Sequence, residues 1–72
     1  MVNVSKLRGR IIEKYGTIGN FAKALKKPIS YVSRIINGNK DMTTREIGVW
    51  SRLLQISSEE IVLYFFADLV NF

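Results

Sequence analysis

The residues best suited to chemistry in this sequence are Ser30, Ser33 and Arg34, which are spaced three and four residues apart in one short segment. On a helix, these spacings place side chains on one face. An arginine can pair with a guanine edge through two hydrogen bonds, and serine hydroxyls can donate or accept. Lys26 and Lys27 precede the segment and add positive charge. This pattern is typical of a surface that contacts base edges in the major groove of DNA.

The segment that positions these side chains is a predicted helix over residues 28–36. Pro28 can begin a helix, because a proline in the first turn loses no helical hydrogen bond. Winding the segment at about 100° per residue places Val32 and Ile35 on the inward side and the three polar residues on the outward side. The preceding helix supplies Ala22, whose small side chain allows the two helices to approach closely. We therefore expect a tight pair of helices that presents a polar outer face.

Further residues around this pair are candidates for contact with DNA. Ile29 and Ile36 lie on one flank of the outward face, where Ile29 can touch a thymine methyl group, and Tyr31 lies near the other flank. The loop after the helix and the start of the preceding helix offer groups for phosphates. The candidate DNA-binding residues are Thr17, Lys26, Lys27, Ile29, Ser30, Ser33, Arg34, Asn37, Asn39 and Lys40.

Each of these residues also has a structural explanation. Arg34 is typical of a solvated helix surface, and serines are common there. Asn37 followed by Gly38 ends a helix whatever the function. Positive charge alone does not distinguish nucleic acid from an acidic protein partner. The DNA-binding hypothesis therefore depends on the combination rather than on any one residue.

Composition limits the function classes. The chain has 72 residues and a mass of 8.3 kDa, which predicts one domain over residues 1–72. It contains neither cysteine nor histidine, which excludes disulfides, zinc fingers, thiol nucleophiles and imidazole bases. Glu59 and Glu60 are adjacent and face different directions on a helix, so they do not form a catalytic carboxylate pair. We expect no enzyme activity, no cofactor and no metal site.

Charge is divided unevenly along the chain. The net charge is +5, yet residues 1–52 carry +8 and residues 53–72 carry −3. This asymmetry predicts a basic surface and a separate acidic, apolar region. The first ten residues lack a secretory signal, and the longest apolar run, residues 61–67, is too short to span a membrane. We expect a cytoplasmic protein without a membrane partner.

Helix signals divide the chain into five segments. Two Ser/Thr-x-x-Glu capping boxes, at residues 43–46 and 57–60, mark the last two helix starts, while Gly16 and Gly38 follow earlier helices. No stretch alternates with the period of a strand. We predict a compact, all-α, five-helix domain with helices at residues 4–15, 17–25, 28–36, 44–54 and 58–66 and a tail at 67–72.

At the end of the chain, residues 61–72 contain more apolar side chains than one helix face can bury. One interpretation is that so small a domain needs every large side chain for its core. The alternative is an interface with a second copy of the chain or with a different regulator. A helix lying on a membrane is disfavoured, because its polar face would carry acidic residues. The candidate protein-interface residues are Ile18, Ile29, Ile36, Tyr64, Phe65, Leu69 and Phe72.

Two stretches resemble a known family. Residues 21–25 (FAKAL) with 32–38 (VSRIING) are similar to the helix-turn-helix of phage Cro and repressor proteins. Residues 53–57 (LLQIS), with the later EI and YFF, are similar to the end of small Cro-like proteins of Gram-positive phages. The resemblance covers residues 6–66, and Lys26 stands where the family has a turn glycine.

The resemblance implies a lambda-repressor-like domain whose third helix enters the major groove. The implied function is a transcriptional regulator of the choice between lysis and lysogeny in a bacterial host, with double-stranded operator DNA as the partner. The apolar end of the chain adds a homodimer as one arrangement. Small phage proteins of similar size include modulators of repression that bind the repressor. The alternative function is therefore an antirepressor that binds a partner phage repressor and alters its grip on DNA.

Overall fold

Five helices form in residues 2–66, the part of the chain that the computed structural model describes. They are α1 (Val4–Tyr15), α2 (Ile18–Leu25), α3 (Ile29–Ile36), α4 (Thr44–Leu53) and α5 (Ser58–Phe65). Every bound lies within one residue of the range expected from the sequence. The prediction of an all-α, five-helix domain is confirmed. The tail at 67–72 lies outside the described residues.

Side chains in the preceding loops begin three of the helices. The Asn3 carboxamide accepts a hydrogen bond from the Lys6 backbone N–H, and the Thr17 hydroxyl accepts one from Asn20 at 3.0 Å. The predicted capping box at the start of α4 is present. There the Glu46 N–H donates to Thr43 Oγ1 at 3.1 Å, and the Thr43 N–H donates to Glu46 Oε1 at 2.7 Å.

Three helices end in the same hydrogen-bonded turn. In each, the residue with positive φ and the one after it donate N–H groups to carbonyls in the last turn of the helix, which is the Schellman arrangement. Gly38 takes this position after α3 with φ 78°, as glycine readily does. Lys26 takes it after α2 with φ 60°, and Gln55 takes it after α4 with φ 56°. Two of the three turns therefore place a residue with a side chain in the left-handed region.

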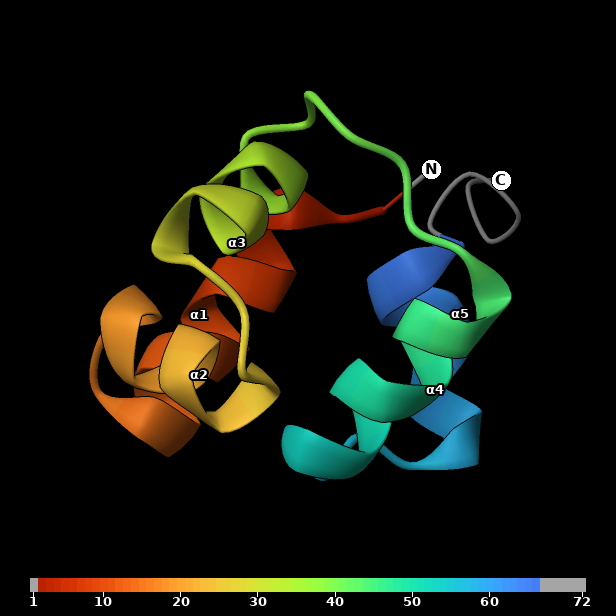
Figure 1. Cartoon of the computed structure of the whole chain (residues 1–72). Coiled ribbons are helices and arrows are strands. Elements are labelled where there is room, and N and C mark those ends of the chain that lie inside the picture. The colour runs from red at the N-terminus through yellow and green to blue at the C-terminus, as the bar shows by residue number, and fades with distance from the viewer. Residues whose placement is uncertain (1, 67–72) are drawn as a thin grey trace.

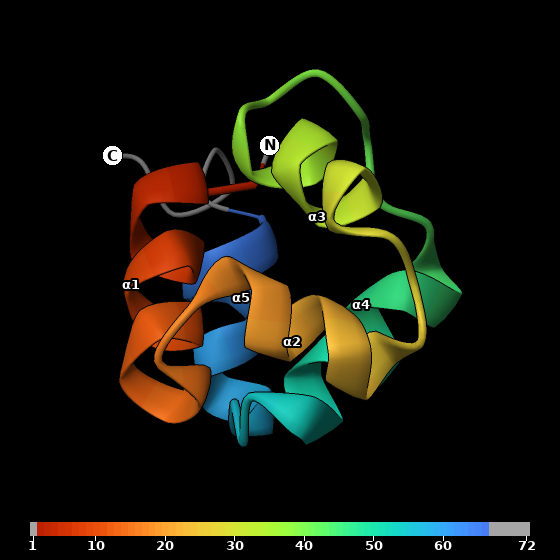
Figure 2. The same cartoon turned by 60° about the vertical axis from the view of Figure 1, so that its left-hand side comes forward.

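The helices form two groups, one of α1, α2 and α3 and the other of α4 and α5, which share one core. α1, α2 and α3 pack against one another, and α5 packs against α1. The segment between α3 and α4 crosses from the first group to α4 (Figure 1). Turning the molecule shows α5 close to α1 (Figure 2), and the Asn3 N–H donates to the Tyr64 carbonyl at 2.8 Å between them.

Aromatic side chains join the two groups. The Phe21 and Trp50 rings pack edge to face with their centres 4.9 Å apart, and the centres of the Tyr15 and Phe21 rings are 5.2 Å apart. Trp50 and Phe21 are completely buried. The buried apolar residues are Leu7, Ile11, Phe21, Ala22, Val32, Ile35, Ile36, Trp50, Leu54, Ile56, Tyr64 and Phe65. The basic and acidic parts of the sequence thus fold around a single core.

Burial corrects part of the expected protein interface. Ile36 is 4% exposed, Tyr64 5% and Phe65 2%, so none of these side chains offers a free apolar surface. Ile36 follows Val32 by four residues and lies on the same face, and α3 packs against α1 as well as α2, which widens its buried face. Leu69 and Phe72 lie outside the described residues.

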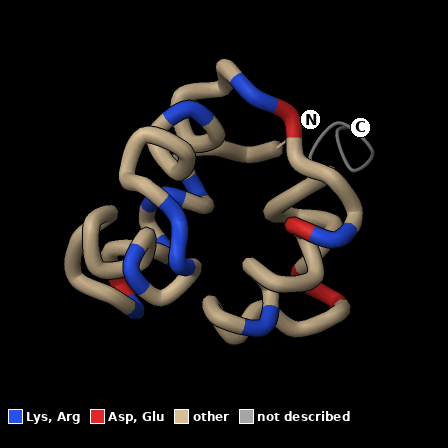
Figure 3. Tube along the Cα trace, viewed as in Figure 1, with Lys and Arg blue, Asp and Glu red and all other residues tan. Residues whose placement is uncertain are grey.

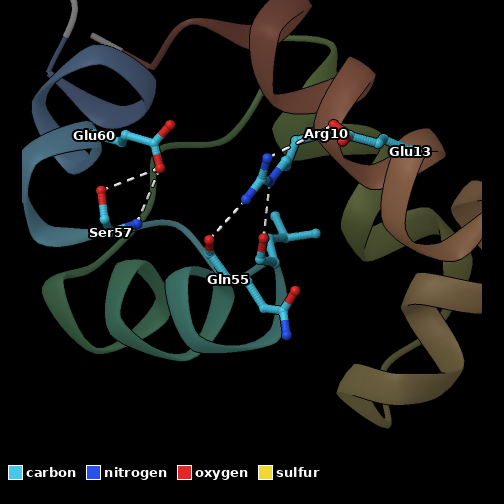
Figure 4. A network of polar contacts seen from close by, with 6 residues as sticks. Arg10, Glu13, Gln55, Ser57 and Glu60 are labelled. Carbon is cyan, nitrogen blue, oxygen red and sulfur yellow. Dashed lines mark hydrogen bonds and ion pairs between the residues drawn. The ribbon is translucent and has the colours of Figure 1, made fainter.

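Arg10 ties α1 to the end of α4 (Figure 4). Its Nε donates to the Leu54 carbonyl at 2.9 Å, and its Nη2 donates to the Gln55 carbonyl at 2.7 Å. These carbonyls have no partner within the helix, so a cation is well placed there. Glu13 lies 3.7 Å from the same guanidinium. Within residues 2–66, no helix has the length and apolar character needed to cross a membrane.

Candidate nucleic-acid interface

α2 and α3 form a closely packed pair joined by a short turn. Ala22 on α2 is 3% exposed, and a Cβ built at Gly19 would lie 3.4 Å from Ile29 Cδ1 on α3. Pro28 immediately precedes α3 with φ −64°, instead of being its first residue as expected. Because small residues line the crossing, α3 is held firmly against α2.

α3 divides into a buried side and an outer side. Val32 is completely buried and Ile35 is 1% exposed, as the helical winding predicted. Ser30 and Arg34 are exposed, and Ser33 is half-buried. The structure therefore brings the three polar candidates together on the outer side of one helix. Hydroxyl and guanidinium groups in this arrangement can form hydrogen bonds with a surface that α3 lies against.

Ile29 stands at the start of α3 and is 54% exposed. Its side chain rests against Gly19 of α2 while its remaining surface faces solvent. Ile18, at the start of α2, is half-buried. Ile29 retains the exposure that the interface hypothesis requires, whereas Ile18 packs partly against the core and Ile36 is buried.

Positive charge surrounds this outer side. Residues 4–36 contain eight Lys or Arg residues and one acidic residue, Glu13. Figure 3 shows most of the basic residues on α1, α2 and α3, in the turn between α2 and α3 and in the segment after α3. Lys26 and Lys27 are exposed in that turn, and Lys40 in the following segment is half-buried. Such a field attracts polyanions.

Asn37 makes a contact that the sequence did not predict, whereas Thr17 caps α2 as the sequence predicts. Asn37, at the end of α3, accepts a hydrogen bond from Arg8 Nη2 at 3.0 Å, while Asn39 is exposed. The Thr17 hydroxyl caps α2, so it already accepts one hydrogen bond. Arg8 therefore lies at the edge of the outer face, and sequence reasoning missed it because 29 residues separate it from Asn37.

A cluster around Tyr31 links α3 to α4. The Tyr31 hydroxyl donates a hydrogen bond to Glu46 Oε2, and Lys40 Nζ lies 3.6 Å from the same oxygen. Lys27 Nζ and Lys40 Nζ lie 5.4 Å and 5.5 Å from the centre of the Tyr31 ring. Both distances are within the range of a cation–π interaction. Sequence reasoning placed Tyr31 on a flank but did not find its partners.

The cluster shifts two pKa values in opposite directions. Burial, the hydrogen bond to Glu46 and the charge of Glu46 raise the pKa of Tyr31 to about 12. Burial opposes the ionisation of Glu46, but hydrogen bonds from Thr43 and Tyr31 and the charge of Lys40 outweigh it and lower the carboxyl pKa below 4.5. At neutral pH, Tyr31 is therefore a hydrogen-bond donor to an ionised carboxylate.

Comparison with known proteins identifies a family. The family model described as "Protein of unknown function (DUF739)" matches residues 1–68. No curated protein matches the chain. Across residues 2–66, no three acidic, histidine or cysteine side chains come together as a metal site would require.

Proposed function

The chain belongs to the DUF739 family, and we propose that it is a phage-type transcriptional regulator that binds operator DNA. In this proposal the domain is a lambda-repressor-like helix-turn-helix, α3 is the recognition helix, and the regulated process is the choice between lysis and lysogeny in the host cytoplasm. α2 lies across the groove, and its N-terminal amides face the phosphate backbone.

The observation that carries the proposal is the division of α3 into two sides. Val32 and Ile35 anchor the helix in the core, which leaves Ser30 and Arg34 exposed on the opposite side. A rigid helix with a polar outer side fits the major groove, whose width admits an α-helix. Arg34 supplies the bidentate group that guanine recognition uses most often.

The electrostatics support the same partner. Eight basic residues and one acidic residue occur in residues 4–36, and one of the eight, Arg8, places its guanidinium beside the end of α3. Lysine and arginine side chains that neutralise phosphates release bound counterions, so the association constant falls as salt rises. The basic surface thus provides affinity, and the outer side of α3 provides the choice of sequence.

Selection from a library of random DNA duplexes tests the proposal. The protein should enrich one sequence motif, and binding to it should weaken steeply between 50 and 200 mM salt. Arg34→Ala should lose about 1–3 kcal/mol of preference at a single base position. Arg52→Ala is the matched control, because Arg52 is also an exposed helix arginine but belongs to α4. Failure to enrich a motif, together with binding that does not respond to salt, would refute the proposal.

Exposed Ile29 favours a second candidate function, an antirepressor that binds a partner phage repressor. An isoleucine that is 54% exposed on the outer flank offers apolar area to a protein partner. Ile29→Asp should abolish association with a cognate phage repressor, as measured by calorimetry without DNA. Ile12→Asp is the control, because Ile12 is 45% exposed on α1. Equal association of both variants with the repressor would remove this candidate.

A further inference from the structure

We propose that Lys27 and Lys40 form a phosphate-binding pair beside α3, and that Tyr31 is the residue that positions both of them. This inference rests on the proposed binding of DNA and assigns one stretch of the phosphate backbone to the α4 side of α3. The two ammonium groups lie 5.4 Å and 5.5 Å from the centre of the same ring, although 13 positions separate the lysines in the sequence. The fold therefore brings both ammonium groups beside one aromatic ring.

Tyr31 is itself fixed at its far end. Its hydroxyl donates to Glu46 Oε2, and the other Glu46 oxygen accepts from the Thr43 N–H at 2.7 Å. Glu46 also belongs to the capping box of α4, so its position is set by the start of that helix. The ring therefore forms a rigid platform between α3 and α4 rather than a mobile surface side chain.

The platform leaves the lysines able to bind an anion. An ammonium group over a ring face is attracted by the π electrons and still has N–H donors for another partner. Glu46 Oε2 lies 3.6 Å from Lys40 Nζ and also accepts a hydrogen bond from the Tyr31 hydroxyl. The negative charge of this carboxylate oxygen is therefore shared between two donors. Ordering two long side chains in advance also lowers the entropy lost when they grip a ligand.

The position of the pair favours the DNA backbone as the ligand. Tyr31 and Arg34 are three residues apart and are neighbours on the surface of α3. A helix lying in the major groove has phosphates along both edges of the groove. The lysines on the Tyr31 flank are therefore placed for the backbone while Arg34 faces the bases.

Salt dependence of binding to a fluorescein-labelled duplex of mixed sequence, followed by anisotropy between 50 and 200 mM salt, tests this inference. Lys27→Ala and Lys40→Ala should each reduce the slope of log K against log salt by about 0.9, the value for one phosphate contact. Arg52→Ala is the matched control, because Arg52 is an exposed arginine on α4 and lies outside the basic stretch at residues 4–36. Its slope should equal that of the wild-type protein.

Two substitutions test the positioning role of Tyr31. Tyr31→Leu removes the ring but no charge, so the slope should stay while affinity falls about three- to tenfold. Tyr31→Phe keeps the ring and should bind within about twofold of wild type. Circular dichroism at the assay temperature checks that both variants are folded. Because both lysine variants alter only long charged side chains, they remain informative if Tyr31→Leu unfolds.

The outcomes separate the two levels of the argument. Salt-dependent binding by wild type with unchanged slopes in both lysine variants would overturn the phosphate pair and leave the DNA proposal intact. Absence of any salt-dependent binding by wild type would overturn both. Wild-type affinity in folded Tyr31→Leu would overturn the positioning role alone.

Discussion

Replacing Lys26 with glycine should make the protein more stable and weaken its binding to DNA. Lys26 has φ 60° and ψ 41°, which lies in the left-handed region. In this conformation the Cβ of an L-residue comes close to the following carbonyl oxygen. The backbone cannot relax, because the Lys26 N–H donates to the Lys23 carbonyl and the Lys27 N–H donates to Ala22, both at 3.1 Å.

The magnitude follows from two opposing terms. The left-handed conformation costs a residue with a side chain about 1–2 kcal/mol relative to glycine. Glycine gains freedom in the unfolded chain, which reduces that benefit by about 0.4–1 kcal/mol. Lys26→Gly should therefore raise the free energy of unfolding by about 0.5–1 kcal/mol, or the melting temperature by roughly 2–8 °C for a domain of this size.

Urea unfolding followed by the fluorescence of Trp50 measures this change. Gln55→Gly is the matched control, because Gln55 has φ 56° in the same hydrogen-bonded turn after α4 and carries no charge. It should gain the same stability without any effect on DNA binding. Gly38→Ala, at φ 78°, should lose about 1 kcal/mol. A gain in Gln55→Gly with none in Lys26→Gly would refute the assignment of strain to Lys26.

Three other predictions concern the polar contacts. Arg10→Lys should lower the free energy of unfolding by about 1–2 kcal/mol, because lysine lacks the guanidinium that donates to both the Leu54 and Gln55 carbonyls. Urea unfolding measures this change, and an unchanged midpoint of the unfolding curve would contradict the prediction. The contribution of Glu46 to stability is complete above pH 4.5 and is lost as pH falls through its lowered pKa. In Glu46→Gln, the free energy of unfolding should therefore fall less steeply than in the wild-type protein as the pH is lowered through the acid range. The contribution of Tyr31 is complete below pH 10 and is lost as pH rises through about 12, so Tyr31→Phe should remove a late component from the ultraviolet phenolate titration.

The helices and the two sides of α3 could be predicted because their signals are local. Capping residues mark the helix starts, and the spacing of Val32 and Ile35 identifies the buried stripe. Both types of signal act within one or two turns of chain, so they do not depend on the rest of the fold. For the same reason, the exposure of Ser30 and Arg34 could be deduced before the structure was known.

Contacts between distant parts of the chain could not be predicted in this way. Arg8 meets Asn37 across 29 residues, and Arg10 meets the Leu54 carbonyl across 44. The burial of Tyr64 depends on the packing of α5 against α1, and a helical wheel of α5 alone contains no information about that neighbour. The Tyr31–Glu46 contact has the same character, because it requires the segment between α3 and α4 to return the chain beside α3.

The division of labour within α3 determines how recognition can change without loss of the fold. Val32, Ile35 and Ile36 fill the core, so substitutions there change stability first. Ser30 and Arg34 are exposed, so a new side chain at either position alters the outer side at little cost in stability. Tyr31 belongs to neither group, because its ring contacts candidate phosphate-binding lysines while its hydroxyl joins α3 to α4. In the proposed complex with DNA, sequence preference can therefore change at Ser30 and Arg34 while the Tyr31–Glu46 hydrogen bond keeps α3 joined to α4.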